Sequence, residues 1–150
     1  MKNTWQRIVS LLVFVVMVLV TSPAMASSLE NDVLQLVNAE RIAAGCQPLA
    51  TDSRLTAASD IRSAEAEVVF AHRRPDGSSV KSVLQGESYS RFGENLAVSH
   101  EADAEAIVDA WMHSPTHRAN ILNHHYTKMG VSCTQGTDGH YYWAQELACD

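Results

Sequence analysis

The stretch Trp111–Leu122, with the sequence WMHSPTHRANIL, most constrains the fold because it contains a helix break of defined geometry. A residue before proline is disfavoured in the α region, and proline is well tolerated as the first residue of a helix after a serine cap. We therefore expect one helix to end near His113 and a short one to begin at Pro115. His117 then lies in the first turn of the second helix. Taken alone, the stretch favours a structural interpretation, in which Ser114 caps and His117 packs.

The spacing of apolar residues on either side of this stretch predicts helices first and strands last. Upstream, apolar side chains recur at helical spacing from Leu29, after a cap at Asp52 and after a cap at Ser99. Downstream, two alternating runs, Met129–Cys133 and Tyr141–Leu147, flank a Gly-Thr-Asp-Gly turn and predict a β-hairpin. The expected fold class is therefore α+β, with helices packed on an antiparallel sheet.

The segment between the second and third predicted helices carries few regular patterns. A Pro-Asp-Gly turn precedes a helical turn over 80–84, and residues 85–91 are expected to form a loop. Gly93-Glu94-Asn95 then suggests a backbone that needs the conformational freedom of glycine, and a brief apolar run follows over 96–98.

The first 26 residues form a predicted signal peptide. Lys2 and Arg7 give a positive start, residues 8–20 are almost entirely apolar, and Ala24-Met25-Ala26 is an A-x-A cleavage site. The apolar run is shorter than the roughly 20 residues of a membrane span, and an uncleaved anchor is the alternative. Cleavage after Ala26 leaves residues 27–150 as one secreted or extracytoplasmic domain with no stable membrane span.

The charge of the mature chain argues against a nucleic acid partner. Residues 1–26 contain two of the 11 basic residues and none of the 17 acidic ones, so nine basic and 17 acidic side chains remain, a net charge of −8. Nucleic acid binding depends on basic patches, and Arg73-Arg74 is an isolated basic pair. The expected partner is an extracellular or envelope ligand, and the expected state is a monomer.

The mature chain retains three cysteines, Cys46, Cys133 and Cys149, and export permits disulfides. An odd number leaves one thiol free or intermolecular, and three pairings are open. We favour Cys46–Cys149, because a bond from the loop after the first helix to the chain end would close a long loop. The absence of a C-x-x-C motif argues against a cysteine zinc site.

Two histidines and a carboxylate, His72, Glu94 and His117, lie at loop and element ends, where functional sites are frequently built. Two imidazoles and a carboxylate can bind a divalent ion such as Zn²⁺ and leave positions open for water. The ion would activate that water, with Glu94 as the general base or as a metal partner. The separations, from 72 to 94 and from 94 to 117, match no local metal motif.

Two weaker hypotheses use the same stretch. His113 and His117 have the i, i+4 spacing of a helical zinc motif, but Ser114 stands where that motif has glutamate, and Pro115 breaks the helix. Ser114, His117 and Glu94 would make a Ser-His-acid triad, but the chain has no G-x-S-x-G elbow.

Short motifs spread over nearly all of Asn31 to Leu147 resemble those of one family. Each motif is weak by itself, but their order and spacing together are highly specific. These motifs are Leu36-Val37-Asn38-Ala39-Glu40-Arg41 with Gly45; Pro48-Leu49 and Leu55; Phe70-Ala71-His72 with Arg74-Pro75-Asp76-Gly77; Gly93-Glu94-Asn95-Leu96-Ala97; Trp111–Leu122; Gly130-Val131; and Tyr142-Trp143-Ala144-Gln145. The chain thus resembles the CAP superfamily, named for cysteine-rich secretory proteins, antigen 5 and pathogenesis-related proteins, and most closely its bacterial secreted branch.

The resemblance implies a three-layer α-β-α sandwich with a central antiparallel sheet and a cleft. In animal and plant relatives, two histidines and two glutamates line the cleft, and the histidines can hold a divalent metal. By motif position, His72 and His117 look like those histidines, Glu94 looks like the first glutamate, and Asn95 follows it. The position of the second glutamate holds Ser114, as is usual in the bacterial branch. These five residues are the expected cleft lining, with His72 and His117 as metal ligands.

Three functions remain open at this point. We favour a secreted, non-enzymatic binding module whose His/Glu cleft holds a divalent metal or a small ligand. The second is an extracytoplasmic metal-assisted hydrolase that uses His72, Glu94 and His117. The third is a structural envelope- or spore-associated protein in which these residues only connect the helices to the sheet.

Overall fold

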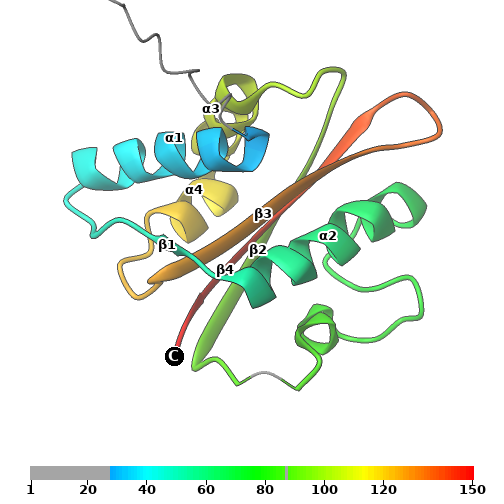
Figure 1. Ribbon diagram of the computed structural model, residues 1–150, viewed down its shortest axis with the longest axis horizontal. Coiled ribbons are helices and arrows are strands. Elements are labelled where there is room, and N and C mark those ends of the chain that lie inside the picture. The colour runs from blue at the N-terminus through cyan, green and yellow to red at the C-terminus, as the bar shows by residue number, and fades with distance from the viewer. Residues whose placement is uncertain (1–27, 87) are drawn as a thin grey trace, which may run out of the picture.

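The computed structural model describes residues 28–86 and 88–150, and the predicted signal peptide with its cleavage site lies outside them. The described elements are, in chain order (Figure 1), α1 (Leu29–Ala43), β1 (Ala50–Thr51), α2 (Ser53–Val68), the 3₁₀ helix η1 (Val80–Leu84), β2 (Arg91–Ser99), α3 (Ala104–His113), α4 (Pro115–Ile121), β3 (Lys128–Gln135) and β4 (Tyr141–Cys149).

The strands form one four-stranded sheet in the order β1-β3-β4-β2. β2 and β3 run antiparallel to β4, whereas the two-residue β1 runs parallel to β3. Helix α2 and η1 cover one face of the sheet, and α1, α3 and α4 cover the other (Figure 1). The predicted α+β fold with three layers is confirmed, although β1 makes the sheet mixed rather than purely antiparallel.

Alternation along β4 divides the core between the two faces of the sheet. Trp143 and Leu147 are buried with the α1, α3 and α4 side chains, whereas Ala148 packs with Leu55 of α2. Fully burying a large apolar side chain stabilises a fold by about 1.5–3 kcal/mol. Small residues on the α2 face let the helix come close, since a Cβ on Gly130 would lie 2.2 Å from the Leu55 carbonyl carbon.

The helix break in WMHSPTHRANIL is confirmed. Helix α3 ends at His113, α4 begins at Pro115, and Ser114 between them has an extended backbone with φ −94° and ψ 118°. The Ser114 side chain makes no cap hydrogen bond, and its Oγ lies 3.5 Å from Thr116 Oγ1. The proline rather than the serine hydroxyl therefore accounts for the break.

Two of the predicted helix caps have different outcomes. Asp52 caps α2 as predicted, by accepting hydrogen bonds from two backbone N–H groups of the first turn. Asp103 caps α3, so the predicted cap at Ser99 is wrong. Ser99 is instead the last residue of β2, where its Oγ accepts the indole N–H of Trp143 at 2.8 Å.

The strand β2 was missed by the sequence patterns. It pairs with β4 over nine residues, from Arg91 opposite Cys149 to Ser99 opposite Tyr141. Gly93, Glu94 and Asn95 thus lie inside a strand, and so does Arg91, which was expected to end a loop. The alternation was hidden because β2 is an edge strand that carries polar residues on both faces, each held by a different neighbouring helix. The predicted hairpin of β3 and β4 is confirmed.

All three cysteines are free, so the predicted Cys46–Cys149 disulfide is absent. Cys46 Sγ donates to the carbonyl oxygen of Leu122 at the end of α4, at 3.3 Å, whereas Cys149 Sγ lies 3.2 Å from Ser90 Oγ. The Cys46 and Cys149 sulfur atoms thus contact different segments of the chain. The length of the loop that a disulfide would close, on which the prediction was based, does not determine these contacts. Cys133 is half-buried in β3, and burial raises the pKa of its thiol to about 12.

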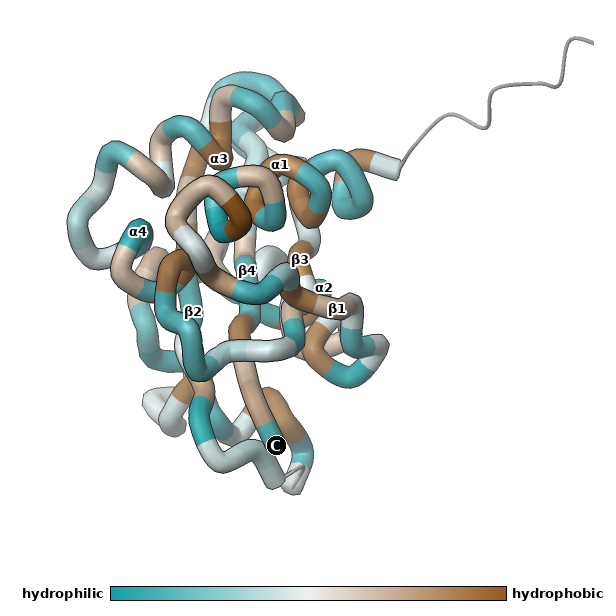
Figure 2. Tube along the Cα trace, turned by 90° about the vertical axis from the view of Figure 1, so that its left-hand side faces the viewer, coloured by the Kyte–Doolittle hydropathy of each residue, from teal (hydrophilic) through white to brown (hydrophobic). Residues whose placement is uncertain are grey.

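Hydrophobic and hydrophilic residues are interspersed along the helices and strands (Figure 2), and most large apolar side chains of the described residues are buried. Within residues 28–86 and 88–150, no helix has the length and apolar character that a membrane span requires.

Candidate functional site

Arg62 in the middle of α2 organises the region around the predicted site. Its side chain is fully buried, and a buried guanidinium is tolerated only with several hydrogen-bond partners. Nε donates to Glu94 Oε2, Nη1 to Glu65 Oε2 and Nη2 to the carbonyl oxygen of Ala71, each at 2.7 Å. Burial opposes the charge of Arg62, but the hydrogen bonds to Glu94 and Glu65 outweigh it and raise the pKa of the guanidinium.

A second arginine completes this ion-pair network near the surface. Arg74 donates to Glu65 through Nη2 at 2.6 Å and through Nε at 2.9 Å. Burial acts to raise the pKa of Glu65, but hydrogen bonds from Arg74 and Arg62 outweigh burial and lower it. The turn-rich segment after α2 is thereby tied to the helix, which fixes the position of His72 between them.

His72 and Glu94 are brought together as one pair. His72 Nδ1 lies 2.8 Å from Glu94 Oε1, with the carboxylate only 2% exposed and the imidazole 61% exposed. Since a carboxylate only accepts hydrogen bonds, the proton in this contact is on Nδ1. In the neutral form of the ring the lone pair is therefore on Nε2.

His117 lies within electrostatic reach of this pair, on α4. Its ring is half-buried, and burial, followed by the charge of His72, lowers the pKa of His117. Neutral imidazole is the form that binds metal ions and accepts hydrogen bonds. The two histidines come from segments 45 residues apart and reach the site from opposite sides of β2.

A chain of amides holds α4 against the outer edge of β2. Asn120 Nδ2 donates to the Glu94 carbonyl oxygen at 3.2 Å and to Asn95 Oδ1 at 2.9 Å. Asn95 Nδ2 donates to the His117 carbonyl oxygen at 3.2 Å and to Gln145 Oε1 at 2.8 Å. Carbonyl groups on the outer side of an edge strand otherwise lack hydrogen-bond partners. These amides therefore satisfy the Glu94 carbonyl group of β2 and fix the backbone of His117 in α4.

The absence of a side chain at Gly93 leaves room for Tyr126 and Asn120 to pack against the edge strand β2. A Cβ at position 93 would lie 2.5 Å from Tyr126 Oη and 3.3 Å from Asn120 Oδ1. The glycine of Gly93-Glu94-Asn95 is therefore required for close approach, not for an unusual backbone conformation as the sequence suggested.

A cleft of about 350 Å³ opens beside His72. It is lined by His72, Ser79, Val80, Lys81, Phe92, Gly93, Glu94 and Asn120. This volume is at the lower end for small-molecule sites, which combine apolar walls with a few polar groups. Phe92 and Val80 supply the apolar part, and His72, Lys81 and Asn120 supply the polar part.

The grouping of ligand-type side chains bears on the predicted metal site. Among residues 28–86 and 88–150, no group of three or more histidine, cysteine, aspartate or glutamate side chains is placed to hold an ion. Glu94 already accepts hydrogen bonds from Arg62 and His72 on both oxygens, which leaves it poorly placed to bind a cation. His72 and His117 remain as the predicted ligands, although the cleft lining includes only His72. They would hold an ion only if water or another ligand completed its coordination.

The other expected lining residues have different surroundings. Asn95 is fully buried and faces the α4 side of the sheet, where it supports His117 rather than opening to the cleft. Ser114 is half-buried at the helix break and contacts Thr116. The position that carries glutamate in animal and plant relatives thus brings no carboxylate to the site.

Sequence reasoning missed two residues behind the cleft. The i, i+3 spacing of Arg62 and Glu65 is compatible with a local ion pair, which is present at 2.7 Å, but the contact of Arg62 with Glu94 requires the fold. Glu146 is fully buried in β4, directly opposite Glu94, and neither of its oxygens has a hydrogen-bond partner among the described residues. An acid between Gln145 and Leu147 in a buried strand was the available signal, but the strand register was not known.

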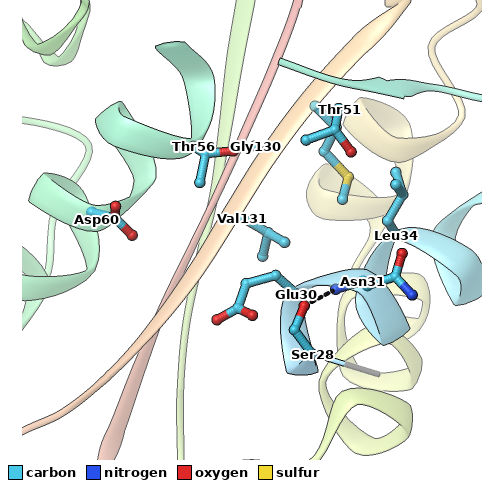
Figure 3. A pocket seen from close by; sticks show the side chains of 10 residues that line it. Ser28, Glu30, Asn31, Leu34, Thr51, Thr56, Asp60, Gly130 and Val131 are labelled. Atoms are coloured by element: carbon cyan, nitrogen blue, oxygen red, sulfur yellow. Dashed lines mark hydrogen bonds between the residues drawn. The ribbon is translucent and has the colours of Figure 1, made fainter. Parts of the chain in front are cut away.

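A separate cavity of about 310 Å³ lies between α1, α2 and the edge of β3. Figure 3 shows Glu30 of α1 and Asp60 of α2 on its two sides, with Val131 between them. No histidine or cysteine lines it. It is therefore distinct from the His72 cleft and lacks the residue types that distinguish that cleft.

Comparison with known proteins agrees with this architecture. The chain is 33% identical to the uncharacterized protein YkwD of Bacillus subtilis over 131 residues, which is 85% of this chain and 49% of YkwD. An extracellular protein with an SCP domain from Bacillus anthracis aligns with a TM-score of 0.73 and 24% identity, over 81% of this chain and 40% of that protein. An outer surface protein of Borrelia burgdorferi aligns with a TM-score of 0.70 and 17% identity, over 82% and 96%.

The first two of these proteins are longer than the chain, which spans about half of YkwD and 40% of the Bacillus anthracis protein. The sequence model of the cysteine-rich secretory protein family matches residues 34–147. That range includes every residue of the cleft described above. The chain therefore belongs to the cysteine-rich secretory protein family, CAP.

Proposed function

We propose that this chain is a non-enzymatic binding module that acts outside the cytoplasm and binds a small polar ligand, or a divalent cation such as Zn²⁺, in the cleft beside His72. The observation that supports this most strongly is the fixed orientation of His72. Its Nδ1 is engaged with Glu94, which leaves Nε2 directed outward, and the pKa of His117 is lowered by its burial. An imidazole held in this way is ready to accept a ligand without rearrangement, and His117 on α4 is the second candidate.

The lining indicates the chemistry of a small ligand. Lys81 and His72 favour an anionic or hydrogen-bonding group, and Phe92 favours an apolar part beside it. An aromatic carboxylate has both features, so benzoate is a suitable probe. Acetate, which has the charge but no apolar part, is the matched control. Perturbation of the NMR signals of Phe92 and His72 by benzoate at lower concentration than by acetate would support the assignment.

Isothermal titration with Zn²⁺ at neutral pH tests the cation version. We expect weak binding that is abolished in the variant His72→Ala/His117→Ala and retained in His124→Ala, which removes an exposed histidine away from the cleft. Circular dichroism of each variant checks that the fold is intact. Absence of Zn²⁺ binding to the unmodified protein refutes the cation version, and unfolding of the double variant favours a structural role for the histidines.

The hydrolase alternative receives less support from the geometry. A general base must be free to take a proton from water, but Glu94 is nearly inaccessible and already accepts hydrogen bonds from Arg62 and His72. Ser114, which would be the nucleophile of a Ser-His-acid triad, contacts Thr116.

Export is also part of the proposal. The extracellular and outer-surface relatives of the same fold support it, together with the charged and apolar pattern of residues 1–26. Mass spectrometry of the protein recovered from the culture medium or the cell envelope should give an N-terminus at Ser27. Recovery only from the cytoplasm, with Met1 intact, would contradict export.

A further inference from the structure

Glu146 is a fully buried acid that does not line the cleft. It lies in the central strand β4, opposite Glu94 of β2 on one side and Gly130 of β3 on the other, and its side chain is on the face covered by α2. It is completely inaccessible, and neither oxygen accepts a hydrogen bond from a donor among the described residues. Buried polar groups without partners are rare in native structures, so this one needs an explanation.

The charges around Glu146 are already balanced. β3 presents only Gly130 opposite it, and no titratable group. Arg62 and Arg74 bring two positive charges, and Glu65 and Glu94 offset both through ion pairs. The charged and titratable groups linked to Glu94 on this face are Arg62 and Glu65 from α2, His72 and Arg74 from the segment after it, and Glu94 itself from β2. Lys128, two residues before Gly130 in β3, is paired with Asp52 and Asp150.

An ionised Glu146 would therefore be an extra, unpaired negative charge in the interior. The effective penalty for such a charge is several kcal/mol, and a carboxyl group avoids it by keeping its proton. Burial, and after it the charge of Glu94, raise the pKa of Glu146 well above its ordinary value. The charge count and the burial of the side chain lead to the same protonation state.

We infer that Glu146 is a neutral carboxylic acid that donates its proton to a hydrogen bond with Glu94, and that it is a positioning residue for His72. Glu94 has about four lone-pair positions, of which Arg62 and His72 use only part. The O–H of Glu146 supplies a further donor from the side of β4. Glu94 is then held from three directions, by α2, by β4 and by the segment that carries His72.

This arrangement fixes the tautomer of His72. A Glu94 carboxylate held in place accepts a hydrogen bond from Nδ1–H of His72. Nε2 is then the nitrogen that is available to a ligand in the cleft. Partners behind a histidine commonly determine how well it binds a metal or another ligand, and their loss typically weakens metal binding by roughly tenfold or more. The consequence for ligand binding rests on the proposed function, whereas the protonation of Glu146 does not.

Infrared spectroscopy of the full mature chain with ¹³C-labelled glutamate tests the protonation directly. We expect a protonated-carboxyl band at neutral pH in the unmodified protein and its loss in Glu146→Gln. Absence of that band from the unmodified protein at neutral pH overturns the inference. This measurement needs no ligand, so its failure is distinct from a failure of Zn²⁺ or benzoate to bind.

The positioning role is tested by ¹⁵N NMR of the His72 ring. We expect Glu146→Gln, whose amide N–H still donates to Glu94, to keep the Nδ1–H tautomer of His72. We expect Glu146→Leu, which has no donor, to shift the ring toward a mixture of tautomers and to weaken Zn²⁺ or benzoate binding by roughly tenfold. Unchanged His72 signals in a folded Glu146→Leu variant overturn the positioning role. If Glu146→Leu does not fold, loss of the tautomer in Glu146→Gln overturns it instead.

Discussion

Replacing Glu146 with glutamine should change how the stability of the protein depends on pH. Burial and the charge of Glu94 raise the pKa of Glu146 in the folded state, whereas its ordinary value of 4.5 applies to the unfolded chain. Above that value the unfolded state loses the proton and the folded state retains it. The unfolded state is therefore favoured increasingly as the pH rises. Glutamine does not titrate, so the variant escapes this effect.

The size of the effect follows from proton linkage. Each pH unit between the unfolded and folded pKa values lowers the free energy of unfolding by about 1.4 kcal/mol. On our inference that Glu146 keeps its proton in the folded state at neutral pH, the effect acts from the ordinary value of 4.5 to about pH 7, roughly 2.5 units. The variant should thus gain about 3.5 kcal/mol relative to the unmodified protein across that interval. At pH 4 and below, the difference should be constant.

Urea unfolding at several pH values, followed by the fluorescence of the buried Trp111 and Trp143, measures this difference. Other groups titrate in both proteins, so subtracting the two pH profiles isolates position 146 and its coupling to Glu94. Glu101→Gln, which removes an exposed acid, is the control and should leave the profile unchanged. Parallel profiles for the unmodified protein and Glu146→Gln, with equal urea dependence, would refute the reasoning.

Three further predictions follow from other parts of the fold. Asp52→Asn keeps the cap of α2 but loses a carboxylate whose pKa is lowered to about 2, mainly by its hydrogen bond with Arg54, so it should cost about 2 kcal/mol at neutral pH. This contribution is present above pH 3.8 and lost as the pH falls toward 2, so thermal unfolding at both extremes checks it. Arg41→Met should cost at least about 3 kcal/mol in urea unfolding, because the buried Arg41 donates to four backbone carbonyl groups that would lose their partner; a cost below 1 kcal/mol would contradict this. Gly130→Ala should cost about 3 kcal/mol or more, since its Cβ would overlap the backbone of α2. The exposed Gly139→Ala has open space around its Cβ but a φ of +85°, so it should cost only about 1–2 kcal/mol of backbone strain.

The local patterns of the chain were sufficient for the helices and the hairpin. The break at Pro115 and the cap at Asp52 depend on the chemistry of a few neighbouring residues, so they could be read without the fold. β2 could not be read in this way. Its polar side chains face a different partner on each side, with Glu94 directed to Arg62 and Asn95 to Gln145, so no simple alternation remains.

The candidate site shows the same difference between what the sequence predicts and what requires the fold. The sequence by itself determined which residues to consider, because the order and spacing of the motifs resemble one family and single out His72, Glu94 and His117 within it. Only the tertiary structure decided what these groups can do, because ionisation and metal binding depend on neighbours that are distant along the chain. Packing of α2 on the sheet commits Glu94 to Arg62, and the register of β2 and β4 places Glu146 behind it. The free Nε2 of His72 is a consequence of those contacts.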